Sequence, residues 1–183
     1  MTATVLDPRT ALVVVDLQKG IVALPTAHPA EEVVARSATL AEAFRAKGLP
    51  VFLVRVTGGA PGRTEGGAPA REPAPDWADI VPELGPRDED VLVTKQQWGA
   101  FHGTALDLEL RRRGITQVVL CGIATSIGVE STARAAHEHG YHVTVATDAV
   151  TDMDADAHRN SVEKIFPRLG ETGTTDAITE LLG

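Results

Sequence analysis

The sequence contains a single cysteine, Cys121, among its 183 residues. One thiol cannot form an internal disulfide, which agrees with a reducing compartment. No apolar run approaches the roughly 20 residues that a membrane-spanning helix needs, and no charged-then-apolar leader opens the chain. These absences exclude a disulfide-stapled fold. They lead us to expect a cytoplasmic protein without a membrane partner.

An excess of positive charge is also lacking, since 25 acidic side chains against 17 Lys and Arg give a formal charge of −8. This balance disfavours nucleic acid and anionic membranes as partners. Metal-ligand spacing is lacking as well, because the six histidines are scattered and no HExxH motif occurs. We therefore expect no metal, no other cofactor, no nucleic acid, and a small-molecule substrate as the partner.

Short apolar runs of strand length alternate with segments of helical periodicity along the chain. The expected strands cover residues 10–16, 51–56, 91–94, 117–121, 141–147 and 171–174. The expected helices cover residues 30–47, 104–113, 129–139, 155–166 and 175–182. This alternation predicts one α/β domain over residues 1–183, with a doubly wound, mostly parallel six-stranded sheet and helices on both faces.

The most informative stretch is QVVLCGIATSIGVESTARAA, residues 117–136, which reads as a strand, a tight turn and the opening of a helix. Open α/β sheets bind ligands at strand ends of this kind. Backbone N–H groups at a helix start lack intrahelical partners, so Ser126, Ile127 and Gly128 are candidates for an oxyanion or carboxylate cradle.

Two charged residues follow other buried strands. Asp16 ends the run TALVVVD, and Lys95 follows VLVT. Because ligands bind outside the carboxyl ends of parallel strands, we expect Asp16, Lys95 and the backbone of residues 124–128 to converge on one crevice. A lysine placed there can neutralise developing negative charge. The simpler alternative for Asp16 is that it caps a following turn.

The segments VVVDLQ, VTKQQWGAFHG and CGIATSIG together resemble the isochorismatase-like hydrolases, a family that includes the cysteine hydrolases. The resemblance implies that Asp16 and Lys95 are catalytic, and that Gly128 stands where most members carry a catalytic cysteine. It implies a substrate-binding set with these members: Ala124, Thr125, Ser126, Ile127, Gln18, Trp98 and Phe101. It also implies a non-proline cis peptide between residues 123 and 124, and assembly into homodimers or homotetramers.

The glycine at position 128 decides which chemistry is available. Cys121 lies inside an apolar strand seven positions earlier, so its thiol is expected to be buried and inert. The cysteine-free isochorismatases also carry glycine at the cysteine position, and the resemblance therefore implies acid-catalysed hydrolysis of a vinyl ether on a small carboxylate of the isochorismate type. Asp16 would donate the proton, while Lys95 stabilises charge or holds substrate carboxylates. Burial would raise the pKa of Asp16 and Lys95 would lower it, and the sequence leaves that balance open.

Two alternatives remain at this stage. Ser126 lies between a strand and a helix, and Asp148 and His158 follow it in the order of a Ser-Asp-His triad. Ala124, however, breaks the G-x-S-x-G pattern. The second alternative is a binding protein that has kept the fold and lost turnover, so that a small amide or ester hydrolase and an inactive binder both stay open.

The loop of residues 57–75 is rich in Gly, Pro and Ala and carries Arg63 and Arg71. Loops of this length inside a compact domain are usually functional or mobile. We assign Arg63 to the substrate-binding set, and a solvated surface arginine is the equal alternative.

Overall fold

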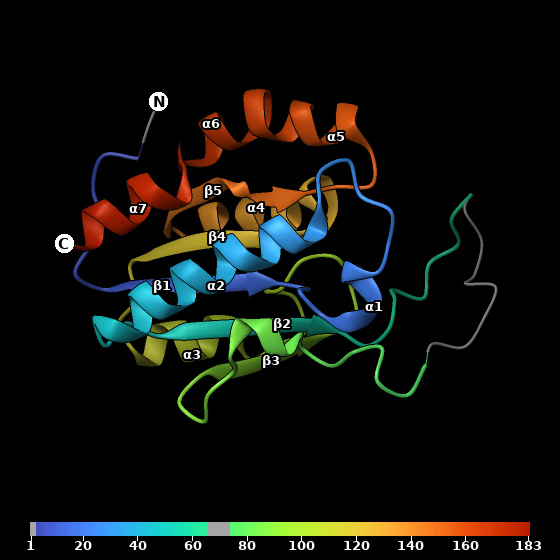
Figure 1. Ribbon diagram of the computed structural model, residues 1–183, viewed down its shortest axis with the longest axis horizontal. Coiled ribbons are helices and arrows are strands. Elements are labelled where there is room, and N and C mark those ends of the chain that lie inside the picture. The colour runs from blue at the N-terminus through green and yellow to red at the C-terminus, as the bar shows by residue number, and fades with distance from the viewer. Residues whose placement is uncertain (1–2, 66–73) are drawn as a thin grey trace.

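The sheet is the central layer of the computed structural model, which describes residues 3–65 and 74–183 (Figure 1). Six parallel strands pair in the order β3-β2-β1-β4-β5-β6. Their bounds are β1 (Thr10–Val15), β2 (Val51–Val56), β3 (Val91–Lys95), β4 (Gln117–Ile123), β5 (His142–Thr151) and β6 (Glu171–Gly173). The predicted parallel six-stranded α/β fold is confirmed.

The central strands β1 and β4 are neighbours and are buried along their whole length. The chain winds outward from β1 to β3 on one side and from β4 to β6 on the other. Doubly wound sheets bind ligands beyond the carboxyl ends of the strands at such a switch point. Gly122 of β4 has φ 122°, and a Cβ there would lie 2.0 Å from the backbone oxygen of Val15. This close approach of β4 to β1 therefore requires glycine.

Helices cover both faces of the sheet (Figure 1). One face carries α2 (Ala30–Ala46), α7 (Thr175–Leu182) and the 3-10 turn η1 (Pro82–Leu84). The other carries α3 (Leu106–Arg112), α4 (Glu130–Glu138) and α6 (Phe166–Leu169). The remaining elements are α1 (Lys19–Val22), α5 (Ala155–Asn160) and two π-helical segments, η2 (Thr125–Val129) and η3 (Ser161–Ile165).

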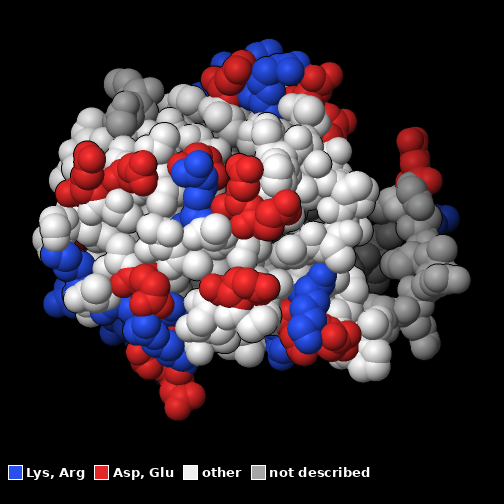
Figure 2. All heavy atoms as spheres, in the orientation of Figure 1, with Lys and Arg blue, Asp and Glu red and all other residues white. Residues whose placement is uncertain are grey.

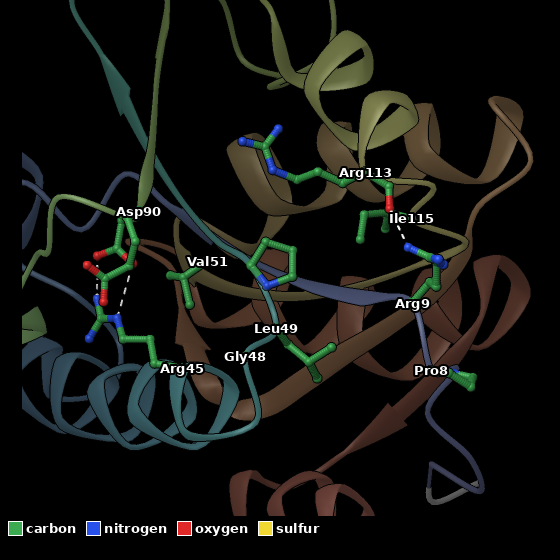
Figure 3. Close-up of a pocket in the computed structure, with 11 residues that line it drawn as sticks. Pro8, Arg9, Arg45, Gly48, Leu49, Val51, Asp90, Arg113 and Ile115 are labelled. Carbon is green, nitrogen blue, oxygen red and sulfur yellow. Dashed lines mark hydrogen bonds and ion pairs between the residues drawn. The ribbon is translucent and has the colours of Figure 1, made fainter.

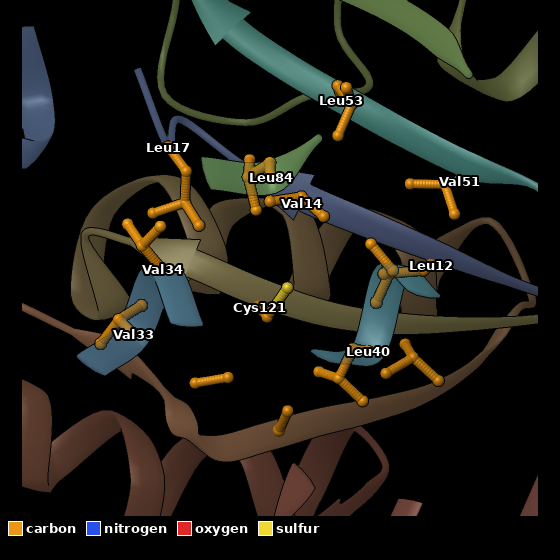
Figure 4. Packing of buried hydrophobic residues seen from close by; sticks show 14 of the residues in the cluster. Leu12, Val14, Leu17, Val33, Val34, Leu40, Val51, Leu53, Leu84 and Cys121 are labelled. Carbon is orange, nitrogen blue, oxygen red and sulfur yellow. The ribbon is translucent and has the colours of Figure 1, made fainter. Parts of the chain in front are cut away.

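The side chains of β1 alternate between two separate hydrophobic cores, one on each face of the sheet. Leu12 and Val14 pack with residues of α2 and α7, where Cys121 of β4 also lies (Figure 4). Val13 and Val15 point to the opposite face and pack with residues of α3 and α4. Side chains of a strand point alternately to the two faces of the sheet, so both helical layers are anchored on the strand that carries Asp16 at its end.

Three strands extend beyond their predicted ends, and β3 does so by one residue, to Lys95. β4 continues through Gly122 to Ile123, and β5 runs to Thr151 rather than Thr147. Asp148 was therefore placed wrongly at a strand end: it lies inside β5, where its carboxylate accepts hydrogen bonds from Arg36 Nη1 at 2.8 Å and Thr175 N at 2.7 Å. These partners allow an acidic residue to lie in a strand that was predicted to end at residue 147.

Charged side chains of both signs are interspersed over the face that carries α2 and α7 (Figure 2). The described part of that face presents no continuous basic patch of the kind that nucleic-acid-binding proteins use. Within residues 3–65 and 74–183, no helix is both long enough and apolar enough to cross a membrane.

Candidate active site

A buried ion pair joins the ends of β1 and β3. Asp16 follows β1 directly, and Lys95 is the last residue of β3. Lys95 Nζ lies 2.7 Å from Asp16 Oδ2, with side-chain exposures of 2% and 7%. Both residues line the same pocket at the carboxyl edge of the sheet, where Ala124 and Gly128 follow β4. The structure thus brings together the charged residues and the turn that the sequence placed at this edge.

The Asp16 carboxyl group has one bonded and one free oxygen. Oδ1 is buried and accepts no hydrogen bond from any of the described residues. Burial raises the pKa of Asp16 from 3.8 to about 6, although the charge of Lys95 and its hydrogen bond lower it. The backbone at Asp16 has φ 54°, a left-handed conformation that is uncommon outside glycine. Backbone strain of this kind clusters at functional sites.

The ammonium group of Lys95 is fully engaged within the protein. Besides Asp16 Oδ2, Nζ donates hydrogen bonds to the carbonyl oxygens of Gln97 at 3.1 Å and Trp98 at 2.8 Å. An ammonium has three N–H donors, so three acceptors saturate it. Lys95 therefore fixes the carboxyl group and the Gln97–Trp98 turn at the same time.

Gly128 leaves space directly beside the carboxyl group. A Cβ at this position would lie 3.2 Å from Asp16 Oδ2, 3.1 Å from Val15 Cγ1 and 3.6 Å from Trp98 O. The Gly128 carbonyl accepts a hydrogen bond from Thr132 Oγ1 at 2.7 Å, which holds the glycine against the pocket. Any side chain at position 128 would point at Asp16.

The pocket has a volume of about 180 Å³ and is largely apolar apart from the ion pair. Ala124, Ile127 and Trp98 of the predicted substrate set line it, as does Gly128. Sequence reasoning did not identify five further apolar lining residues, which come from α1, its following turn, β2, the end of β4 and the turn after β5: Ile21, Leu24, Val56, Ile123 and Met153. Leu24, Trp98 and Met153 stay exposed at its rim.

The expected cradle of free N–H groups is not formed by the first residues of the turn. Ser126 N donates to Asp152 Oδ2 at 2.7 Å, and Ile127 N donates to the carbonyl of Ala124 at 3.2 Å. Thr125 is buried, with Oγ1 2.9 Å from His158 Nδ1. The N–H groups of Ser126 and Ile127 are therefore bonded within the protein, to Asp152 and within η2. Thr125 and Ser126 are also not among the residues that line the pocket.

Three other members of the predicted set also lie outside the pocket lining. Gln18 is fully buried, and its amide bonds both N and O of Val56, joining the chain after β1 to β2. Phe101 is a core residue that stacks on His139 with ring centroids 5.1 Å apart. Arg63 is exposed on its loop. Arg71 falls outside the described residues.

Asp152 is a positioning residue that the sequence reading missed. It is 2% exposed; Oδ2 binds Ser126 N, and Oδ1 accepts from Asp154 N at 3.2 Å. Its own carbonyl accepts from Ala27 N at 2.8 Å. If the end of β5 had been predicted at Thr151, Asp152 would have been recognised as the acidic residue that directly follows the strand.

The groups of the alternative serine triad are not assembled. His158 Nδ1 faces Thr125, and Asp148 is bound to Arg36 and Thr175. Cys121 is fully buried in β4, and burial raises the pKa of its thiol to about 12. In the described part of the chain, no three His, Cys, Asp or Glu side chains gather closely enough to hold a metal ion.

Comparison with known proteins points to one family. Residues 10–177 match the model of the Isochorismatase domain. An uncharacterised isochorismatase family protein, YecD of Escherichia coli O157:H7, is 48% identical, with 94% of this chain and 96% of that protein aligned. The solved structure of an isochorismatase family protein from Burkholderia thailandensis matches with 46% sequence identity, 97% of both chains covered and a TM-score of 0.92.

A more distant relative is the ureidoacrylate amidohydrolase RutB of Methylobacterium radiotolerans, which is 29% identical over 97% of this chain and 81% of its own length. The family follows from three findings: the domain model matches most of the chain, the identity to family members is high, and the parallel sheet is shared. This chain belongs to the isochorismatase family and is a hydrolase.

Proposed function

We propose that this hydrolase cleaves a small vinyl ether by proton donation from Asp16, without a covalent enzyme intermediate. The observation that carries the proposal is Asp16 Oδ1, a buried carboxyl oxygen at the pocket that has no hydrogen-bond partner among residues 3–65 and 74–183. A pKa of about 6 keeps a usable fraction of this carboxyl group protonated near neutral pH. General acids work best when their pKa lies near the working pH.

The proposed reaction begins when the Asp16 carboxyl group donates its proton to the terminal carbon of the enol ether. The resulting oxocarbenium ion is attacked by water, and the hemiketal then collapses to a ketone and an alcohol. For an isochorismate-type substrate these products are pyruvate and a dihydroxylated cyclohexadiene acid. The proton released from the attacking water returns the site to its starting state.

In this mechanism Lys95 positions the acid and does not bind the substrate carboxylate. Its three donors already hold Asp16 and the carbonyls of Gln97 and Trp98. Binding a substrate carboxylate would require giving up one of these bonds. Its positive charge also limits the rise of the Asp16 pKa, because burial alone would push it further.

A nucleophilic mechanism is less well supported. The described residues that line the pocket include no Ser, Thr, Cys or His side chain. Ser126 is not among the lining residues, and its backbone N–H donates to Asp152 Oδ2. The space beside Gly128 is instead suited to the substrate carbon or to the attacking water, since a side chain there would contact Asp16.

The test is a substrate panel of isochorismate and small amides, assayed by product formation and by intact-protein mass spectrometry during turnover. The proposal predicts hydrolysis of the vinyl ether with no mass shift on the protein. An acyl adduct at Ser126 or Cys121 would contradict the proposal and support a nucleophilic mechanism. Saturable binding of every panel member without turnover would instead establish a binding protein on the same fold.

We further propose that the protein acts in the cytoplasm as a homodimer or homotetramer. The rim of the pocket supports this assembly, because Leu24, Trp98 and Met153 expose apolar surface there. Multi-angle light scattering at micromolar concentration should give two or four chains per particle. A monomer at that concentration would refute the assembly.

A further inference from the structure

A second cavity of about 760 Å³ lies at the end of the sheet opposite Asp16. Figure 3 shows the residues that line it. Its lining comes from the segments that lead into four adjacent strands: residues 8–9 before β1, residues 48–51 at the start of β2, residues 89–90 before β3, and residues 113 and 115 before β4. We call it the rear cavity. Its volume is in the range of small-molecule sites.

One wall of the rear cavity is a closed ion pair. Arg45 Nη2 lies 2.6 Å from Asp90 Oδ2, and Nε donates to Oδ1 at 3.1 Å. Both side chains are less than 5% exposed. Arg45 Nη1 also bonds Glu42 and the carbonyl of Leu84. This wall is rigid, and its two opposite charges cancel.

The facing wall carries Arg9, whose side chain is hydrogen-bonded but has no carboxylate partner among the described residues. Arg9 Nη1 donates to the carbonyl of Arg113 at 3.2 Å, and its own carbonyl accepts from Thr116 N at 2.9 Å. Its stem crosses Gly114, where an added Cβ would lie 3.4 Å from Arg9 Cδ. Within residues 3–65 and 74–183, no carboxylate lies within ion-pair distance of Arg9.

Arg113 is already neutralised, because its Nη1 bonds the carbonyl and the carboxylate of Glu109. Between the two walls the floor is apolar and is formed by Leu49, Pro50 and Ile115. Figure 3 shows Leu49 between the Arg45–Asp90 pair and Arg9. The cavity therefore combines an apolar floor with one available guanidinium.

We infer that the rear cavity binds a small monocarboxylate with an apolar body, whose carboxylate pairs with Arg9 and whose body lies on Leu49, Pro50 and Ile115. A guanidinium presents parallel N–H donors that match a carboxylate. Among the described lining residues, Arg9 is the one cation without a carboxylate partner, and Glu89 lies on the other wall, so a dianion is disfavoured. This site is independent of the reaction at Asp16.

The probe is benzoate, measured by calorimetric titration and by ¹H–¹⁵N NMR on the full chain, with benzamide as its neutral isostere. Benzoate should saturate at millimolar concentration and move the amide signals of Gly48, Leu49 and Ile115. Benzamide should bind at least about tenfold more weakly, because it lacks the charge that Arg9 recognises. Equal affinity of the two probes, or shifts confined to Ile127 and Gly128, would overturn the inference.

Arg9→Gln should weaken benzoate binding about tenfold, whereas Arg63→Gln removes the same charge from an exposed loop and should leave it within twofold. An equal loss of benzoate affinity in both variants would show that only the net charge matters, and it would contradict a binding site at Arg9. If Arg9→Gln does not fold, Glu89→Gln decides the matter. Removing that exposed carboxylate should strengthen benzoate binding about twofold, and an unchanged affinity would overturn the inference.

Discussion

Two ion pairs are buried in the described part of the chain, and they differ in how completely their polar atoms are bonded. In the pair of Arg45 with Asp90, both carboxylate oxygens accept hydrogen bonds, including one from Arg87 N at 2.8 Å. In the pair of Lys95 with Asp16, the lysine is saturated while Asp16 Oδ1 has no partner among the described residues.

This difference separates a structural pair from a reactive one. A buried polar atom without a partner costs free energy, and such an atom in a native structure needs an explanation. At Asp16 the explanation is a substrate that completes the bonding. At Asp90 nothing is left to bind, and the pair serves to join α2 to the start of β3.

The largest expected effect comes from Asp16→Asn, since an amide cannot donate the proton. We expect kcat/KM to fall about 10²- to 10⁴-fold. Asp90→Asn is the matched change in the other pair, and it should leave kcat/KM within twofold. Equal losses of activity in both variants would abolish the distinction between the pairs.

Stability should show the reverse pattern. Asp90→Asn leaves the buried Arg45 with the exposed Glu42 as its one carboxylate partner among the described residues, and it should lower the free energy of unfolding by about 3 kcal/mol in urea denaturation. Asp156→Asn removes a surface pair and should cost less than about 0.5 kcal/mol. A cost at Asp90 as small as that at Asp156 would show that the buried pair is not structural.

For Asp16→Asn the sign of the stability change follows from the raised pKa. A folded-state pKa of about 6 against 3.8 unfolded gives a contribution that is present below pH 3.8 and lost as the pH rises through 6. The ionised carboxylate therefore costs on the order of 3 kcal/mol at pH 8. Asp16→Asn should be at least as stable as wild type at pH 8 in urea denaturation, with the difference shrinking toward pH 4. A large loss at pH 8 would mean that Asp16 is a structural partner of Lys95.

A smaller effect is expected when the space beside Asp16 is filled. Gly128→Ala places a Cβ 3.2 Å from Oδ2, and we expect kcat/KM to fall about tenfold through misplacement of the acid or the substrate. Gly59→Ala is the control, because Gly59 lines the same pocket but nothing lies within 4 Å of its added Cβ. If the control were equally impaired, crowding of Asp16 would not be the cause.

The smallest effects should come from the groups of the nucleophilic alternatives. Ser126→Ala and treatment with iodoacetamide should each leave kcat/KM within about twofold, because Ser126 is not a lining residue and the Cys121 thiol is buried. An inactive serine variant, or inactivation that tracks Cys121 alkylation, would favour a covalent route.

The fold and the position of the site followed from strand patterns. Buried apolar runs gave β1 and β3, and the polar residue at each end, Asp16 and Lys95, lies where a doubly wound sheet binds ligands. These inferences needed only local sequence and one topological rule.

The side-chain partners could not be predicted from local sequence. Gln18 and Phe101 stand beside site residues along the chain, yet their bonds and packing turn them into the interior. Conversely, Val56 and Met153 reach the pocket from β2 and the turn after β5, far from the motif. Whether a polar group is free to bind substrate depends on neighbours that are distant in sequence, such as Asp152 beside Ser126.

The central claim is that Asp16 acts as an acid, and the pH dependence of kcat/KM for vinyl ether hydrolysis tests it most directly. Because the protonated form of the free enzyme is required, kcat/KM should be constant below pH 6 and fall tenfold per pH unit above it. The same limb should be absent from the residual activity of Asp16→Asn. A kcat/KM that rises through pH 6 to a plateau would show instead that the ionised carboxylate acts as a base, and it would contradict the proton-donation mechanism.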